Sequence, residues 1–107
     1  MITATFKKKN NQFVGYEIKG HANYAPEGQD IVCAAVSALS LAVNHKIHAN
    51  VQSFESVTRG YMDIELFEPT QETEISITIL YDGLKSIEEE YPKNLRVEVI
   101  KDVEETV

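Results

Sequence analysis

Hydrophobic and polar residues alternate in four stretches of the chain, which is the spacing of half-buried β-strands. Residues 2–6 and 12–19 alternate in this way, and the turn-forming residues 9–11 between them predict a β-hairpin. Residues 60–67 and 95–100 predict two further strands. We therefore expect a sheet of four strands.

Two helices are predicted between these strands. After Asp30, a residue type that often caps a helix, apolar residues recur every three or four positions at Val32, Val36, Leu39, Val43 and Ile47. The second segment is ambiguous, because residues 75–79 have strand propensity while helical spacing continues from Ile77 to Tyr91. The longer pattern favours a helix, at a cost of about 1 kcal/mol for Gly83 in its interior.

Residues 20–30 form a predicted loop, because they contain two glycines and one proline and have little apolar periodicity. Loops of this length are uncommon in compact domains and often carry function. The element order is then ββαβαβ. It favours a single α/β (α+β) domain over residues 1–107, in two layers, with two helices packed on the sheet. Residues 102–107 are expected to fray.

Composition and charge indicate where in the cell this domain acts and which class of partner it binds. No stretch approaches the roughly 20 uncharged apolar residues of a membrane span, and the N-terminus lacks the apolar block of a signal peptide. We therefore expect a soluble, cytoplasmic protein without a membrane partner. The formal net charge is −7, with +2 in residues 1–50 and −9 in residues 51–107. Such a chain is a poor binder of nucleic acid, and a basic partner suits it better.

Cys33 is the only cysteine in the chain and the strongest candidate for chemistry. A single cysteine forms no internal disulfide, which fits a reducing compartment. If Asp30 caps the helix, Cys33 lies in the first turn, where free backbone N–H groups and the helix dipole favour the thiolate. His21, at the end of the second predicted strand, is the candidate base. The alternative is a small core residue, as lone cysteines in apolar helices usually are.

Residues beside the predicted helix start have further possible roles. The backbone N–H groups of Val32 and Cys33 are candidate donors to the oxyanion that forms when a carbonyl is attacked. Asp30 either caps the helix or orients His21. Ser37, one turn after Cys33, either contacts the thiol or substrate or bonds the carbonyl four residues back.

Tyr24, in the predicted loop, either lines a substrate groove or anchors the loop. His45 and His48 share a helix face, and Glu55 is the only further ligand that the sequence suggests for them. Two histidines without a defined third ligand are weak evidence for a metal site. We expect no metal and no other cofactor.

Residues 20–39 read GHANYAPEGQDIVCAAVSAL, and they contain GHA, then YA, G and DIVCA, then VSAL. This pattern, with its gaps, resembles the signature of Prp, the family of ribosomal-processing cysteine proteases. The resemblance implies that His21 is the catalytic histidine and Cys33 the nucleophile, and it leaves the role of Asp30 open. A weaker likeness continues to Leu95.

The resemblance also implies an activity, a substrate and an assembly. The family members are cysteine endopeptidases that form homodimers and have a mobile loop, which corresponds here to residues 21–30. Their substrate is the precursor of a large-subunit ribosomal protein, whose short N-terminal extension is removed after paired phenylalanines and before an alanine. The alternative is a non-catalytic, ribosome-associated module that holds a peptide in the same groove.

Overall fold

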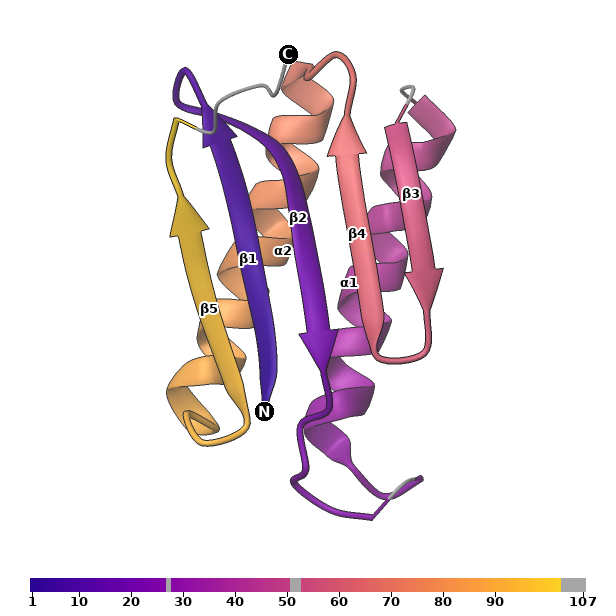
Figure 1. Ribbon diagram of the computed structural model, residues 1–107, viewed down its shortest axis with the longest axis vertical. Coiled ribbons are helices and arrows are strands. Elements are labelled where there is room, and N and C mark those ends of the chain that lie inside the picture. Colours follow the sequence, from indigo (N-terminus) through magenta and orange to yellow (C-terminus); the bar gives the residue numbers. More distant parts are fainter. Residues whose placement is uncertain (27, 51–52, 103–107) are drawn as a thin grey trace.

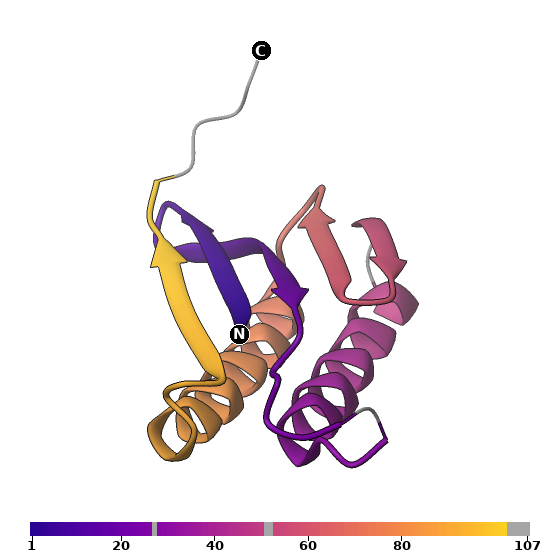
Figure 2. The same ribbon diagram turned by 60° about the horizontal axis from the view of Figure 1, so that its bottom comes forward.

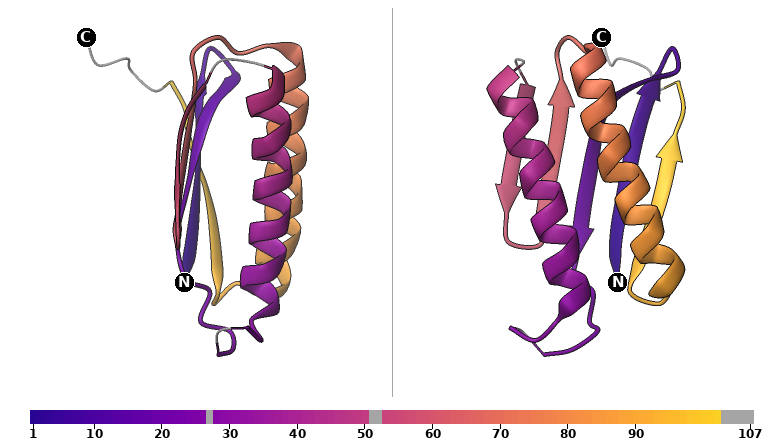
Figure 3. Two further views of the ribbon diagram at one scale, coloured as in Figure 1. Left: turned by 90° about the vertical axis from the view of Figure 1, so that its right-hand side faces the viewer. Right: turned by 180° about the vertical axis from the view of Figure 1, so that it is seen from behind.

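The computed structural model describes residues 1–26, 28–50 and 53–102, apart from the side chains of residues 50 and 54. The elements follow in the order β1 (Ile2–Lys9), β2 (Gln12–Gly20), α1 (Ile31–Asn50), β3 (Ser53–Thr58), β4 (Tyr61–Leu66), α2 (Gln71–Glu90) and β5 (Leu95–Ile100). The strands form one sheet in the order β3-β4-β2-β1-β5, and both helices cover the same face (Figure 1 and Figure 3). The predicted two-layer α+β domain is confirmed. The predicted fraying at the C-terminus falls mostly on residues 103–107, outside the described residues.

One strand was absent from the predicted order, so the observed order is ββαββαβ. The added strand is β3, which pairs antiparallel with β4 from Ser53 opposite Leu66 to Thr58 opposite Tyr61. Its sequence, SFESVT, does not alternate, because its two apolar residues are three positions apart. An edge strand has only one neighbour, so a weak apolar pattern is enough to hold it.

Strand register places several chain ends at one edge of the sheet. Ile2 lies opposite both Gly20 of β2 and Leu95 of β5, and Lys19 lies opposite Tyr61 of β4. The end of β2 and the starts of β1, β4 and β5 therefore lie side by side, at the bottom of Figure 1. We call this the lower edge of the sheet.

Helix α1 contributes a buried stripe to the core, formed by Val32, Val36, Ser40, Val43 and Ile47. Contrary to the sequence expectation, the stretch Ile31–Ala49 has the length and mean hydropathy, 1.3, of a membrane span, and 33% of it is buried. The expectation was wrong because the Ser, Asn and His residues scattered through this stretch interrupt its apolar pattern, while its mean hydropathy is still high. A core helix that covers a sheet has the same length and composition.

Helix α2 begins with a capping box, in which Thr70 Oγ1 accepts the Thr73 N–H at 3.2 Å and Thr73 Oγ1 accepts the Thr70 N–H at 2.8 Å. Gly83 lies where α1 packs against α2, and a Cβ at this position would collide with the side chain of Leu39. The glycine thus lets the two helices approach closely. This packing explains why a residue of low helix propensity stands inside α2.

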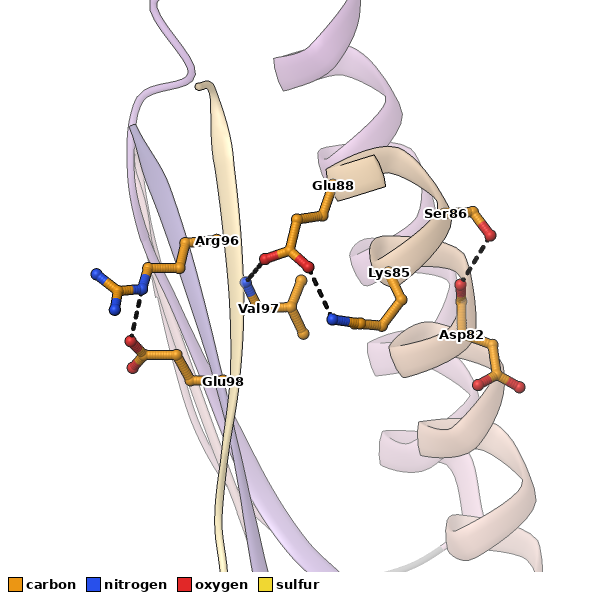
Figure 4. A network of polar contacts seen from close by, with 7 residues as sticks. All are labelled: Asp82, Lys85, Ser86, Glu88, Arg96, Val97 and Glu98. Carbon is orange, nitrogen blue, oxygen red and sulfur yellow. Dashed lines mark hydrogen bonds and ion pairs between the residues drawn. The ribbon is translucent and has the colours of Figure 1, made fainter. Parts of the chain in front are cut away.

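Glu88 ties the last turns of α2 to the edge strand β5 (Figure 4). Its Oε2 accepts the backbone N–H of Val97 at 2.6 Å, and its Oε1 accepts Lys85 Nζ at 2.8 Å. Burial alone raises the pKa of Glu88, but the hydrogen bonds from Lys85 and Val97 outweigh it, so the pKa lies below the usual 4.5. The carboxylate thus satisfies an N–H group at the edge of the sheet.

Replacing Glu88 by Ala should destabilise the fold by about 1–2 kcal/mol, because the Val97 N–H and Lys85 lose their acceptor. Thermal unfolding at pH 7 should show this as a Tm several degrees lower, while the exposed neighbour substitution Glu89→Ala should change Tm little. The pKa of Glu88 is lowered in the folded state, so its contribution is complete above pH 4.5 and is lost as the pH falls below that value. Equal Tm values for the two variants at pH 7 would show that the Glu88 contacts do not stabilise the fold.

Candidate active site

His21 and Cys33 lie on segments that meet at the lower edge of the sheet. The loop between them leaves the end of β2 and returns to the start of α1, as Figure 2 shows. Both residues line one pocket of about 860 Å³. Further residues from the loop, from α1 and from the β3–β4 turn line the same pocket, among them Asp30, Ser37, Leu41, Thr58 and Gly60. The fold thus brings the two predicted residues to a common cavity.

Cys33 lies in the first turn of α1, as the sequence predicts, and is partly buried against the core. Its backbone N–H donates to Asp30 Oδ1 at 2.9 Å, and the Ala34 N–H donates to the Asp30 carbonyl at 3.0 Å. These two bonds make Asp30 the N-cap of the helix. Val32, which is 1% exposed, anchors this turn in the core.

The Asp30 carboxylate also holds the loop. Its Oδ2 accepts the backbone N–H groups of Tyr24 and Ala25, at 3.0 and 3.4 Å. The bond from the Cys33 N–H is the largest influence on the pKa of Asp30, and with the loop bonds it outweighs desolvation and holds that pKa below the usual 3.8. Every hydrogen bond that the described residues make to this carboxylate comes from backbone N–H groups, and none comes from His21.

The cap occupies one of the two predicted oxyanion donors. The N–H of Cys33 donates to Asp30, and the N–H of Val32 is close enough to the same carboxylate to lower its pKa. An oxyanion can therefore use the Cys33 N–H only by replacing the carboxylate there.

The backbone on each side of His21 is fixed, while its side chain is exposed. Before it, the Gly20 N–H donates to the Gly60 carbonyl at 2.9 Å. After it, the Ala22 carbonyl accepts Asn94 Nδ2 at 3.0 Å, and Ala22 itself is buried. The imidazole ring lies against Gly60, since a Cβ on that glycine would come within 2.9 Å of ring atoms Cε1 and Nε2.

The two proposed substrate contacts occupy different places. Tyr24 is half exposed, and its ring packs edge-on against Tyr91 at the end of α2, with centroids 5.3 Å apart. Within the described part of the chain, the pocket lining does not include Tyr24, so the tyrosine anchors the loop here. Ser37 is exposed and lines the pocket. The hydrogen bond to the carbonyl four residues back is made instead by Ser40, whose Oγ donates to the Val36 carbonyl at 2.7 Å.

Gly60 and Asn94 hold the His21 segment, yet the sequence patterns did not single them out. A glycine before a strand indicates a turn, and Gly60 has the positive φ of +76° that favours glycine there. Its contact with a histidine on another element has no local signal. The same is true of Asn94, which reaches Ala22 across 72 positions of sequence.

Among the described residues, no group of three or more His, Cys, Asp or Glu side chains is arranged to hold a metal ion. His48 lies beside Glu55 instead, with Nδ1 and Oε2 3.5 Å apart. The other carboxylate oxygen of Glu55 accepts Asn44 Nδ2 at 2.8 Å. These contacts join α1 to β3, away from the pocket.

Comparison with known proteins places the chain in one family. The family model for cysteine protease Prp matches residues 1–96. The ribosomal processing cysteine protease Prp of Bacillus subtilis is 35% identical over 109 residues, covering 91% of this chain and 96% of that protein. Its counterpart in Mycoplasma pneumoniae is 32% identical over 80 residues, covering 74% and 80%.

Solved structures share the fold. The protease Prp from S. aureus, crystallised with a covalently linked product peptide, matches with a TM-score of 0.84 at 24% identity, over 94% of this chain and 100% of that one. A protein from Streptococcus mutans matches with a TM-score of 0.77 at 27% identity, over 94% and 95%. The chain belongs to the cysteine protease Prp family, and it is therefore a cysteine-type endopeptidase.

Proposed function

We propose that this endopeptidase removes a short N-terminal extension from the precursor of a large-subunit ribosomal protein, with Cys33 as nucleophile and His21 as base. The observation that carries the proposal is the common pocket that both residues line. The signature-like residues 20–39 support the two roles. The relatives named ribosomal processing proteases, and the S. aureus structure with a substrate peptide, support the substrate class.

The reaction proceeds in two steps. The Cys33 thiolate attacks the carbonyl carbon of the scissile bond, and the C–N bond breaks as the His21 imidazolium gives its proton to the leaving amine. The extension is then bound to Sγ as a thioester. His21, now neutral, takes one proton from water as the water oxygen attacks the thioester. The C–S bond breaks, the extension leaves as a carboxylic acid that keeps the other proton, and the thiolate of Cys33 and the imidazolium of His21 are restored.

The oxyanion of each step takes the place of the Asp30 carboxylate at the N–H groups of Val32 and Cys33. Two anions cannot share these donors, so the Asp30 side chain rotates away when substrate binds. Rotation also releases the N–H groups of Tyr24 and Ala25. Opening of the loop is thereby coupled to formation of the oxyanion site.

The pocket lining suits an apolar segment before the cleaved bond. It includes the side chains of Ile18, Leu41, Val57 and Met62. Leu41 and Val57 are 50% and 42% exposed, so a bound peptide with phenylalanines would remove apolar surface from water on both partners. Ser37, on the same lining, supplies a polar contact to the substrate or to the thiol.

Asp30 has two tasks in this proposal: it caps α1, and it holds Tyr24 and Ala25 of the loop against the start of the helix, which we call the latch. It does not orient His21. Its carboxylate accepts hydrogen bonds from backbone N–H groups on both sides of the loop. Tyr24 has a similar task, because its ring fixes the loop to Tyr91. Together they order the segment that connects the base to the nucleophile.

The assembly that we propose is a homodimer in the cytoplasm, without membrane or direct nucleic-acid contacts. Ile75 and Ile79 lie one turn apart on α2 and are 55% and 56% exposed. A second copy of the chain packed on this helix would cover them. A reducing cytoplasm keeps the Cys33 thiol free and contains the ribosomal substrate.

Cleavage of the extended ribosomal protein tests the function directly. The wild type should release one N-terminal fragment, Cys33→Ala should release none, and His21→Ala should be about 10²–10⁴-fold slower because the general acid and base is lost. Mass spectrometry of the products is the measurement. His45→Ala, which removes an exposed histidine of α1, should leave the rate unchanged. An intact precursor after incubation with folded wild type would sink the proposal and favour the peptide-binding module.

Amide hydrogen exchange tests the latch. Asp30→Ala should speed exchange at Tyr24, Ala25 and Cys33, because all three N–H groups lose their acceptor. Asp30→Asn keeps one acceptor oxygen for the helix cap, so Cys33 should stay protected while the loop amides exchange faster. The pKa of Asp30 is lowered in the fold, so wild-type protection should be complete above pH 3.8 and fall below it. Unchanged exchange in both variants would rule out the latch.

The mass of the particle in solution tests the dimer. Light scattering coupled to gel filtration should give twice the chain mass for the wild type. Ile79→Glu should lower it toward the monomer, because a charge would be buried at the interface. Gln12→Glu, at an exposed position of β2 away from this helix, is the control and should remain dimeric. A monomeric wild type would contradict this assembly.

A further inference from the structure

The turn between β3 and β4 touches the His21 segment in two ways. The carbonyl of Gly60 accepts the Gly20 N–H at 2.9 Å, which fixes the backbone directly before His21. The imidazole ring lies over the same glycine, with Cε1 and Nε2 both 2.9 Å from the position that a Cβ on Gly60 would occupy. One residue thus contacts both the backbone of Gly20, directly before this histidine, and the histidine ring.

Only glycine leaves room for this contact. Real Cβ atoms essentially never come within 3.0 Å of another heavy atom, so any L side chain at position 60 displaces the ring. The φ of +76° also favours glycine, but asparagine tolerates such a φ and occupies it at Asn10 and Asn11. A residue that the backbone alone would accept at position 60 would therefore push the exposed His21 ring out of its place.

The turn is a firm support compared with the loop that carries His21. It joins two strands that pair along their whole length, and β4 also pairs with β2 as far as Lys19 opposite Tyr61. His21, in contrast, lies at the first position of a long loop and is exposed. A ring on such a loop has several rotamers, unless a neighbouring surface selects one.

We propose that Gly60 is a positioning residue for catalysis: its bare backbone forms the seat that sets the His21 imidazole toward the pocket shared with Cys33. The inference rests on the proposed function, because it assumes that His21 is the base. It adds the β3–β4 turn to the machinery, which otherwise consists of the loop and the start of α1. Gly60 acts through His21 and does not itself touch the reacting atoms.

Substitutions at position 60 test the seat through the rate of precursor cleavage. Gly60→Ala and Gly60→Asn should each lower kcat about 100-fold with little change in KM, because displacing a catalytic group by about 1 Å costs that much. Asn10→Ala is the control for backbone strain, since it places alanine at φ 52° in the β1–β2 turn, at the other end of the sheet. It should cost a similar amount of stability and leave kcat unchanged.

The His21→Ala background separates positioning from general damage. If Gly60 works through the imidazole, Gly60→Asn should slow the His21→Ala enzyme by no more than about twofold, because the group it positions is already absent. An equal loss of kcat in both backgrounds would overturn the seat. A folded Gly60→Asn variant with the kcat of the wild type would also overturn the seat. This second variant decides the test if Gly60→Ala fails to fold.

A nuclear Overhauser effect checks the contact without any turnover. In the wild type, His21 Hε1 should show a cross-peak to the Gly60 Hα protons, and its absence would overturn the seat whatever the activity. A wild type with this cross-peak but without cleavage would confirm the contact and overturn the proposed function. The two ideas can therefore fail separately.

Discussion

The carboxylate of Asp30 is the group on which the geometry of the site depends. One oxygen accepts the N–H of Cys33 and so begins α1, and the other accepts the N–H groups of Tyr24 and Ala25 and so folds the loop back on the helix. A helix start and a long loop each expose backbone donors that need acceptors. Because a single side chain serves both, the helix turn that carries Cys33 and the loop that carries His21 are ordered together.

The sheet supplies the rest of the frame. Its register aligns the end of β2 with the start of β4, so the β3–β4 turn reaches His21, and it aligns β1 with β5, so Asn94 reaches Ala22. The loop is thus attached at both of its sides and also to α2 through the Tyr24–Tyr91 ring pair. These attachments define the path of the loop between β2 and α1.

Local patterns were sufficient to predict the parts of the fold that repeat. The hairpin of β1 and β2 follows from alternation and from Asn10 and Asn11, whose φ values of 52° and 62° suit a tight turn. Both helices followed from spacing, and the Asp30 cap followed from its place before Ile31. Strand β3 was missed because an edge strand needs little apolar surface, and the apolar average of α1 was concealed by scattered polar residues.

Candidate residues were found where chemistry and motif coincide, as at His21 and Cys33. The residues that hold the His21 segment, Gly60 and Asn94, were not found. They contact it across the sheet, and no sequence spacing connects them with His21. Asp30 lies between these cases: its cap was predicted as one of two roles, whereas its bonds to Tyr24 and Ala25 depend on a loop path that the sequence does not specify.

The most direct test of the account is the intact mass of the protein during turnover. A precursor peptide with an activated ester at the scissile bond should acylate the enzyme faster than water removes the acyl group. A rapid acid quench should then reveal protein heavier by the acyl extension, with the added mass on Cys33. Ester turnover with an adduct on another residue, or with the same adduct and rate in Cys33→Ala, would contradict the central claim that Cys33 is the nucleophile.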